Sequence, residues 1–182
     1  KVRYMYIPTF PETQSLIEAD MKQGELWATA YLTEDDVLLN ELKTGDAHAI
    51  TALEAFPWLT RDHPQFKAYR EIGKLFNFGT LFNRTEEGYA KNPFQGRKPP
   101  AGLEDFKLTK LQARAIMQKQ WKRWPKVKAT QAKWIKEALT TGELRTVSGW
   151  KRRFWITNFK TANQSVNLGP QTLSHEYLFD SL

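Results

Sequence analysis

Cysteine is absent from this chain of 182 residues. Its absence excludes disulfides, thiolate metal sites and cysteine nucleophiles. No apolar run approaches the ~20 residues that a membrane-spanning helix needs, and no secretion signal is recognisable at the start. We therefore expect a soluble, intracellular protein with no membrane partner. An initial Met is also lacking, because the chain begins at Lys1. We therefore expect either a processed or excised product or a sequence whose true start lies before Lys1. The length suits one ordinary domain or two small lobes.

The two charge signs are unevenly distributed: basic residues are scarce in the first third of the chain, and acidic residues are outnumbered in the rest. Residues 1–60 hold ten acidic and four basic side chains, whereas residues 61–182 hold ten acidic and twenty-three basic ones. Residues 107–136 contain ten basic residues and no acidic one. Three tryptophans are interleaved with them, namely Trp121, Trp124 and Trp134. Such a field attracts a polyanion. The alternative is a solvated helical face whose tryptophans pack inward.

Hydrophobic periodicity predicts a mostly helical protein with a small amount of sheet at both ends. Strands are expected at residues 3–7 and 16–20, and a hairpin is expected to pair residues 143–148 with 150–157 around Gly149. The expected helices span residues 23–32, 35–43, 46–56, 63–83, 108–124 and 127–140, and a last one starts at about residue 162. The proline- and glycine-rich residues 91–105 indicate a loop. Gly169-Pro170 is expected to interrupt or kink the last helix.

Several residues predict local details of these helices. Gly45 is expected to end one helix, and Asp46 is placed to cap the next. Gly73 and Gly79 lie inside the long helix at residues 63–83. Each costs about 1 kcal/mol relative to alanine there, which predicts a close approach by another group.

The helix at residues 63–83 carries an arginine, a lysine and two phenylalanines at intervals of four residues: Arg70, Lys74, Phe78 and Phe82. Steps of four place side chains along one slowly drifting stripe of a helix. Two cations followed by two flat rings suit a triphosphate at one end and a base at the other. The alternative is an ordinary amphipathic helix whose phenylalanines are in the core and whose cations are in water.

Five segments, taken in order, resemble motifs of the family A DNA polymerases. They are 20–27 (Asp-Met-Lys-Gln-Gly-Glu-Leu-Trp), 45–48 (Gly-Asp-Ala-His), the stripe at 70–82, 142–153 with its basic cluster, and 167–171 (Asn-Leu-Gly-Pro-Gln). The first looks like the family's Asp-x-x-x-x-Glu motif after a strand, and its Glu-Leu-Trp ending is similar to the mitochondrial or phage branch. The resemblance covers nearly the whole chain.

The resemblance implies a catalytic metal site at Asp20. This carboxylate would bind two Mg²⁺ ions, and Met21 would add a backbone carbonyl. Glu25 would lie under the incoming sugar and reject a ribose 2′-hydroxyl, which favours deoxynucleotides. By the residues alone, an acidic strand end such as Asp20 is also compatible with a solvated turn.

The resemblance also assigns residues to the nucleotide. His48, Arg70 and Lys74 would hold the triphosphate, and Lys74 would donate a proton to the departing pyrophosphate. Phe78 would stack near the incoming sugar and base, and its lack of a hydroxyl implies poor acceptance of dideoxynucleotides. Considered alone, His48 is better explained as a satisfied core histidine, and Arg70 and Lys74 are also compatible with solvated cations.

Contacts to the primer–template are implied for Phe82, beside the templating base, and for Arg152, Asn167 and Gln171. The last two are also compatible with plain surface amides. Two positions depart from the family pattern near these residues. Phe82-Asn83 stands where the family usually has Tyr-Gly, and Asn163 stands where it often has arginine.

The family's second carboxylate motif, a His-Asp-Glu hairpin, would follow roughly thirty residues after Gln171, but the sequence ends at Leu182. Asp180 comes too early and in a helical context. We therefore expect a chain that is inactive alone and is completed by another polymerase chain carrying the thumb and the second carboxylate. A split gene, a split-intein precursor or cleavage would each produce it.

The fold implied is α/β and mostly α: a helical fingers subdomain attached to part of a palm β-sheet. The expected division is residues 1–33 (palm, first motif), 34–142 (fingers) and 143–182 (return to the palm). The function expected is template-directed DNA synthesis in the cytoplasm of a bacterial or phage-infected cell, with mitochondria as the alternative. The competing functions are a non-catalytic nucleic-acid-binding module and a single-subunit RNA-synthesising enzyme.

Overall fold

The computed structural model describes residues 10, 12, 13, 22–155 and 158–180, and within them the chain is mostly helical with one small sheet. The helices are α1 (Gly24–Thr33), α2 (Asp36–Thr44), α3 (Ala47–Ala55), α4 (Phe66–Leu81), α5 (Glu86–Lys91), α6 (Lys110–Arg123), α7 (Pro125–Thr141) and α8 (Phe159–Asp180), and the strands are β1 (Glu143–Arg145) and β2 (Lys151–Arg153). The strands expected at residues 3–7 and 16–20 lie outside the described residues. None of the helices in the described part is long and apolar enough to cross a membrane.

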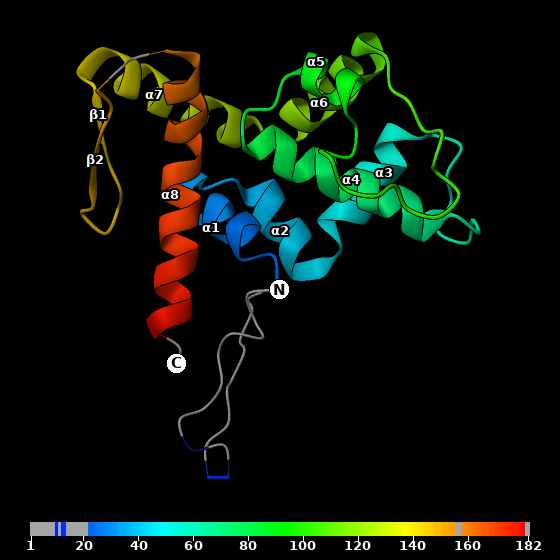
Figure 1. The fold of residues 1–182 in the computed structure, drawn as a ribbon, viewed down its shortest axis with the longest axis horizontal. Coiled ribbons are helices and arrows are strands. Elements are labelled where there is room, and N and C mark those ends of the chain that lie inside the picture. The colour runs from blue at the N-terminus through cyan, green and yellow to red at the C-terminus, as the bar shows by residue number, and fades with distance from the viewer. Residues whose placement is uncertain (1–9, 11, 14–21, 156–157, 181–182) are drawn as a thin grey trace.

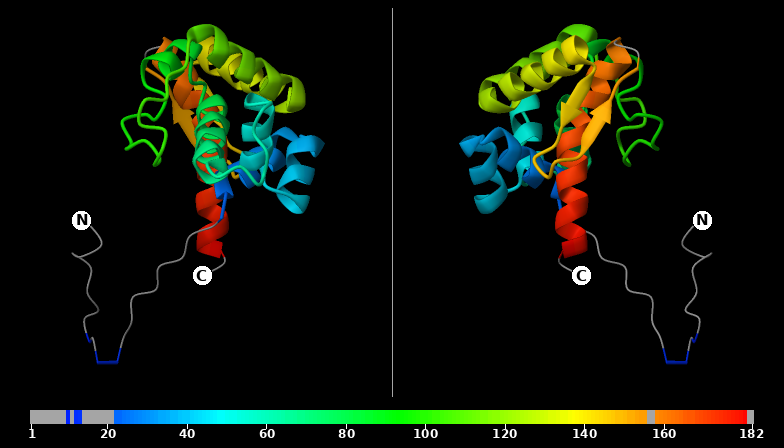
Figure 2. Two further views of the ribbon diagram at one scale, coloured as in Figure 1. Left: turned by 90° about the vertical axis from the view of Figure 1, so that its right-hand side faces the viewer. Right: turned by 90° about the vertical axis from the view of Figure 1, so that its left-hand side faces the viewer.

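The elements form two groups, which are joined where α6 meets α7 and where α2 contacts both α1 and α3 (Figure 1). In one group, α8 runs along α1 and α7, and the hairpin of β1 and β2 lies beside α8 (Figure 2). In the other group, α3 packs along α4, and α5 packs on α6. The mostly α form of the α/β class is therefore confirmed.

Two acidic caps set the starts of α2 and α3. Asp35 accepts a hydrogen bond from the Leu38 amide, and Asp46 accepts from the amides of His48 (3.0 Å) and Ala49 (3.2 Å). Gly45 is the residue that ends α2. The predicted roles of Gly45 and Asp46 are confirmed. The cap at Asp46 orients the first turn of α3, which carries a residue of the candidate site.

Gly73 allows α3 and α4 to cross at close range. A Cβ placed there would lie 2.2 Å from the backbone oxygen of His48 and 3.0 Å from the amide nitrogen of Ala52. At Gly79, a Cβ would lie 2.0 Å from the hydroxyl oxygen of Tyr89. Both glycines are therefore required by a close neighbour, as the sequence predicted, and Gly73 brings His48 against the α4 stripe.

Two apolar clusters support α4. One contains Phe76, which stacks on Tyr89 with ring centroids 4.2 Å apart. The other contains Leu26 of α1, Leu81 of α4 and the fully buried Trp124, and it joins the start of the chain to α7. The helix that carries the stripe is thus packed on both sides rather than suspended in solvent.

Two expectations about helices were wrong or incomplete. Gly169-Pro170 does not interrupt the last helix, because α8 continues through it to Asp180 and begins earlier than predicted. Gly169 there lies against Leu32 and Trp134, so packing on α1 and α7 outweighs the local cost of a proline. The short helix α5 was not predicted. The hairpin is confirmed, with Glu143 opposite Arg153 and with Gly149 at a φ of 89° in its turn. Its strands are shorter than predicted, and residues 156–157 of the predicted second strand lie outside the described residues.

Candidate nucleotide-binding site

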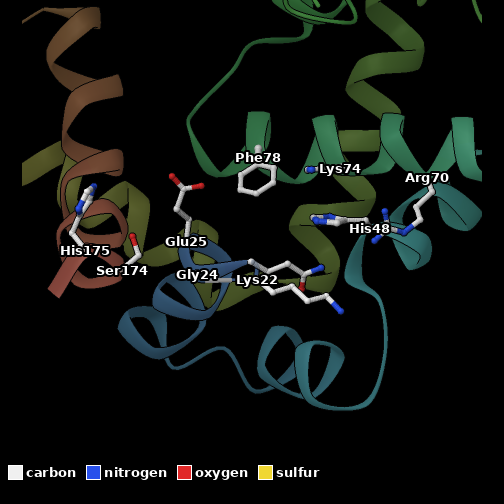
Figure 3. A pocket seen from close by; sticks show the side chains of 10 residues that line it. Lys22, Gly24, Glu25, His48, Arg70, Lys74, Phe78, Ser174 and His175 are labelled. Carbon is white, nitrogen blue, oxygen red and sulfur yellow. The ribbon is translucent and has the colours of Figure 1, made fainter. Parts of the chain in front are cut away.

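A cleft of about 540 Å³ opens where the N-terminal ends of α1 and α3, one face of α4 and the C-terminal part of α8 converge (Figure 3). Its lining residues are Lys22, Gln23, Gly24, Glu25, His48, Arg70, Lys74, Phe78, Ser174 and His175. Among the residues that the structure describes, the cleft is therefore lined by cations, imidazoles, one carboxylate and one phenylalanine ring.

Three members of the predicted stripe face this cleft. Arg70, Lys74 and Phe78 follow one another along α4, and all three line it, as Figure 3 shows. Phe78 also packs on the cluster around Trp124 and lies 5.8 Å from the His48 ring, centroid to centroid. The spacing argument is thus correct for these three residues, whose side chains are half-buried rather than fully solvated.

The fourth member of the stripe, Phe82, is not part of the cleft lining. It caps the end of α4, lies 6.0 Å from Phe78 and packs on the same cluster. The next residue, Asn83, has a φ of 57° and donates a hydrogen bond of 2.8 Å to Asn163 on α8. The two departures from the family pattern at Asn83 and Asn163 therefore contact each other.

Asp46 holds Arg70 in place. The Arg70 Nε donates to Asp46 Oδ2 at 2.5 Å, while Oδ1 of the same carboxylate caps α3. Burial alone would raise the pKa of Asp46, but the hydrogen bonds from Arg70 and from the α3 amides outweigh it, so the pKa lies below the usual value. The carboxylate therefore stays ionised and fixes the arginine head at the rim of the cleft.

His48 lies at the start of α3 and is 2% exposed. Burial, reinforced by the nearby Arg70 and Lys74 cations and opposed by Asp46, lowers the pKa of His48 to about 4. The imidazole is therefore neutral at physiological pH. Its Nδ1 lies 2.9 Å from the Asn77 Nδ2.

Glu25 comes from the first turn of α1, and its carboxylate points into the cleft between Phe78 and His175 (Figure 3). It is the acidic residue among those that line the cleft. Asp20 and Met21 lie outside the described residues. In the described part of the chain, no three His, Cys, Asp or Glu side chains cluster as a metal site would require.

A second hollow, of about 650 Å³, adjoins the first and shares Glu25, Ser174 and His175 with it. Arg152 of β2, Gln171 of α8 and Trp150, which is 67% exposed, line this hollow. Asn167 is not among its lining residues. The buried Asn167 Oδ1 has no hydrogen-bond partner among the residues that the structure describes. Of the four residues expected near the primer–template, Arg152 and Gln171 thus line one hollow, whereas Asn167 and Phe82 are not among its lining residues.

The basic stretch at residues 107–136 is partly neutralised by acidic residues from other elements. Arg123, which is nearly buried, pairs with Glu41 (3.1 Å) and with Glu54. Lys110, Arg114 and Lys126 pair with Glu87, Glu86 and Asp36. Trp124 is fully buried, and Trp121 and Trp134 are half-buried. The tryptophans therefore pack inward, and four of the ten cations form ion pairs with acidic residues of other elements.

Sequence reasoning missed several residues at or behind the site. Ser174 and His175 line the cleft, but no motif pointed to them, and Lys22 lines it from within the first motif without having been given a role. Asn77, fully buried behind His48, did leave a signal, because an amide on the apolar face of a helix requires hydrogen-bond partners. Its partners could not be predicted, since they come from α3 and α6.

Comparison with known proteins identified one matching family and several similar proteins. The model of the family described as DNA polymerase family A matches residues 1–171. DNA polymerase I of Caldicellulosiruptor bescii is 28% identical over 167 residues, which is 91% of this chain and 17% of that protein. DNA polymerase I of Geobacillus stearothermophilus is 25% identical over 167 residues, again 91% of this chain and 17% of that protein. The chain thus spans about a sixth of the length of these curated relatives.

Among solved structures, the POL domain of Pol1 from M. smegmatis, in complex with DNA primer-template and dNTP, superposes with a TM-score of 0.60. It is 19% identical, and the match covers 84% of this chain and 25% of that one. At this identity, the likeness supports the fold.

Proposed function

The chain belongs to DNA polymerase family A, and on that premise we propose that its cleft binds a deoxynucleoside triphosphate for template-directed DNA synthesis. The observation that carries the proposal is the convergence of Arg70, Lys74 and Phe78 from one helix face with His48 and Glu25 from two other helices. Cations and a ring in this order suit a triphosphate and the sugar and base joined to it.

In this proposal, the cations take the charge of the triphosphate. Arg70, held by Asp46, presents its remaining N–H groups to phosphate oxygens, and Lys74 supplies a second cation one turn further along α4. Lys74 is also the proton donor for the departing pyrophosphate. The neutral His48 adds a hydrogen-bond donor without adding charge.

The other end of the cleft receives the sugar and base. Phe78 stacks there, and Glu25 occupies the space beside the ring, where it would exclude a ribose 2′-hydroxyl. The adjoining hollow with Arg152 and Gln171 is the proposed path of the primer–template, and Phe82 and Asn167 are proposed to act near it. Residues 34–142 correspond to the fingers subdomain, between palm segments at 1–33 and 143–182.

We propose Mg²⁺ as the metal, held through Asp20 and the Met21 carbonyl, because such oxygen ligands suit it. When bound, the metal activates the primer hydroxyl and stabilises the leaving pyrophosphate. The second carboxylate is proposed to come from outside residues 1–182, on a partner chain or a further part of a longer protein.

Binding of dATP in the presence of Mg²⁺, followed by tryptophan fluorescence, tests the nucleotide site. Lys74→Ala is expected to weaken binding by about tenfold or more, the usual effect of losing a charge-assisted hydrogen bond. Lys67→Ala is the matched control, because it removes the same charge from an exposed position of α4. Equal affinities for both variants and the unaltered protein would contradict the proposed site.

Templated primer extension tests the chemistry. The chain is combined with a family A palm segment that carries the second carboxylate, together with a primer–template, Mg²⁺ and the four deoxynucleotides. Extension that is lost in Asp20→Ala supports polymerase activity. A binding module would instead bind primer–template equally well after Asp20→Ala and never respond to a deoxynucleotide. Glu25→Ala is expected to raise ribonucleotide incorporation.

A further inference from the structure

Asn77 is fully buried on α4 directly behind the cleft, and every hydrogen-bonding position of its amide is used. Its Nδ2 donates to the backbone oxygen of Ala47 at 3.1 Å and lies 2.9 Å from His48 Nδ1. Its Oδ1 accepts from Thr51 Oγ1 at 2.6 Å and from Gln120 Nε2 at 2.7 Å. The residue therefore links α3, α4 and α6 at one point.

The contact with Ala47 fixes which way the Asn77 amide faces. A backbone carbonyl oxygen only accepts hydrogen bonds, so the atom beside it is the amide nitrogen. The second hydrogen of that nitrogen is directed at His48 Nδ1. This ring nitrogen must then act as the acceptor, which means that it carries no proton. In a neutral imidazole the proton is consequently on Nε2.

We propose that Asn77 is a positioning residue that holds His48 in the neutral Nε2–H tautomer, so that this N–H donates to a phosphate oxygen in the cleft. With Nδ1 occupied, Nε2 is the ring nitrogen left for a ligand. The phosphate role rests on the proposed nucleotide site, whereas the tautomer can be measured without any nucleotide.

The charges around His48 agree with this assignment. Arg70 and Lys74 face it from α4, and Asp46 faces it from the turn before α3. Two cations against one carboxylate, together with burial, oppose protonation of the ring and keep its pKa far below neutrality. Arg70 and Lys74 supply positive charge for a triphosphate, and the oriented Nε2–H of His48 adds a directional hydrogen bond to one phosphate oxygen. A buried carboxylate in place of the Asn77 amide would reverse this balance.

The rest of the network keeps the Asn77 amide from rotating. Gln120, itself buried, accepts from Thr80 Oγ1 at 2.7 Å while it donates to Asn77. Thr51 accepts from Arg123 Nη2 at 2.5 Å. Satisfied buried networks of this kind hold one arrangement, because any rotation leaves polar atoms unpaired.

Long-range ¹H–¹⁵N NMR of the ¹⁵N-labelled full chain measures the tautomer directly. The chain has three histidines, so His63→Gln and His175→Gln are enough to assign the His48 signals. We expect the His48 ring to show a protonated Nε2 and an unprotonated Nδ1 throughout pH 5.5–8. An Nδ1–H tautomer or an imidazolium at pH 7 would overturn the proposal.

Two variants separate positioning from general support of the fold. Asn77→Asp replaces the amide donor with an acceptor and is expected to move a proton onto His48 Nδ1. Thr80→Val removes a hydrogen bond of the same network without touching His48, and it is expected to lower stability but leave the tautomer unchanged. An unchanged tautomer in Asn77→Asp, or the same change in both variants, would refute the positioning role.

Titration with dATP and Mg²⁺ completes the test. We expect the His48 Nε2 signal to shift on binding, and Asn77→Asp to weaken binding by about tenfold. If dATP does not bind to the unaltered protein while the tautomer is as expected, the proposed nucleotide site fails and the positioning of His48 stands. If dATP binds without moving the Nε2 signal, the phosphate contact is refuted.

Discussion

Replacing Gly73 by alanine tests whether the close crossing of α3 and α4 builds the site. The added Cβ would lie 2.2 Å from the His48 backbone oxygen, about 1 Å inside an ordinary carbon–oxygen contact. The obstacle is backbone, so a helix must move. Overpacking of this kind costs up to about 3 kcal/mol, and the better helix propensity of alanine returns about 1 kcal/mol. We expect a net loss of about 2 kcal/mol.

For a chain of this length, that loss lowers the Tm by about 4–8 °C, which thermal unfolding followed by circular dichroism will detect. Gly88→Ala is the matched control, because its Cβ would meet only side-chain atoms at 3.4 Å. It is expected to stabilise α5 by up to about 1 kcal/mol. Gly73→Ala should also weaken dATP binding, since it moves His48 away from Arg70 and Lys74. A Gly73→Ala protein as stable as the Gly88→Ala control would refute this reasoning.

Three further predictions concern contacts around the site. Arg123→Ala leaves Glu41 buried without its cation and is expected to cost about 3 kcal/mol in urea unfolding, whereas an equal stability would show that the pair contributes nothing. Folding lowers the pKa of Asp46, so its ionised carboxylate stabilises the folded protein above about pH 4, and this stabilisation is lost as the pH falls through the lowered pKa. The difference in the free energy of unfolding between the unaltered protein and Asp46→Asn should therefore shrink below about pH 4. Asn83→Ala is expected to lower the stability by about 1–2 kcal/mol more than Asn83→Gly, because position 83 has a φ of 57°. Both variants lose the hydrogen bond to Asn163, so equal Tm values for the two would contradict this prediction.

Local sequence signals predicted most of the helices because each has its own chemistry. The cap at Asp46, the stop at Gly45 and the hairpin turn at Gly149 depend on backbone geometry that a few neighbouring residues determine. The six-residue helix α5 escaped prediction, since it is too short to show a period. The continuity of α8 through Pro170 was mispredicted, because its packing on α1 and α7 is a property of the whole fold.

The candidate site was predictable only in part, for a similar reason. The spacing of Arg70, Lys74 and Phe78 is enough to place them on one face of a helix. That His48 and Glu25 would meet this face followed only from the resemblance to a family, because the crossing of three helices has no local signature. The partners of Asn77 were beyond reach, since they lie 26 to 43 residues away in the chain.

The two departures from the family pattern at Asn83 and Asn163 make sense together. Asn83 occupies a left-handed conformation that favours glycine, and asparagine is among the side chains that tolerate it best. Its amide then donates a hydrogen bond of 2.8 Å to Asn163 on α8. One contact thus joins the end of the stripe helix to the helix that carries Gln171. The two asparagines that depart from the family pattern are therefore hydrogen-bonded to each other at this junction.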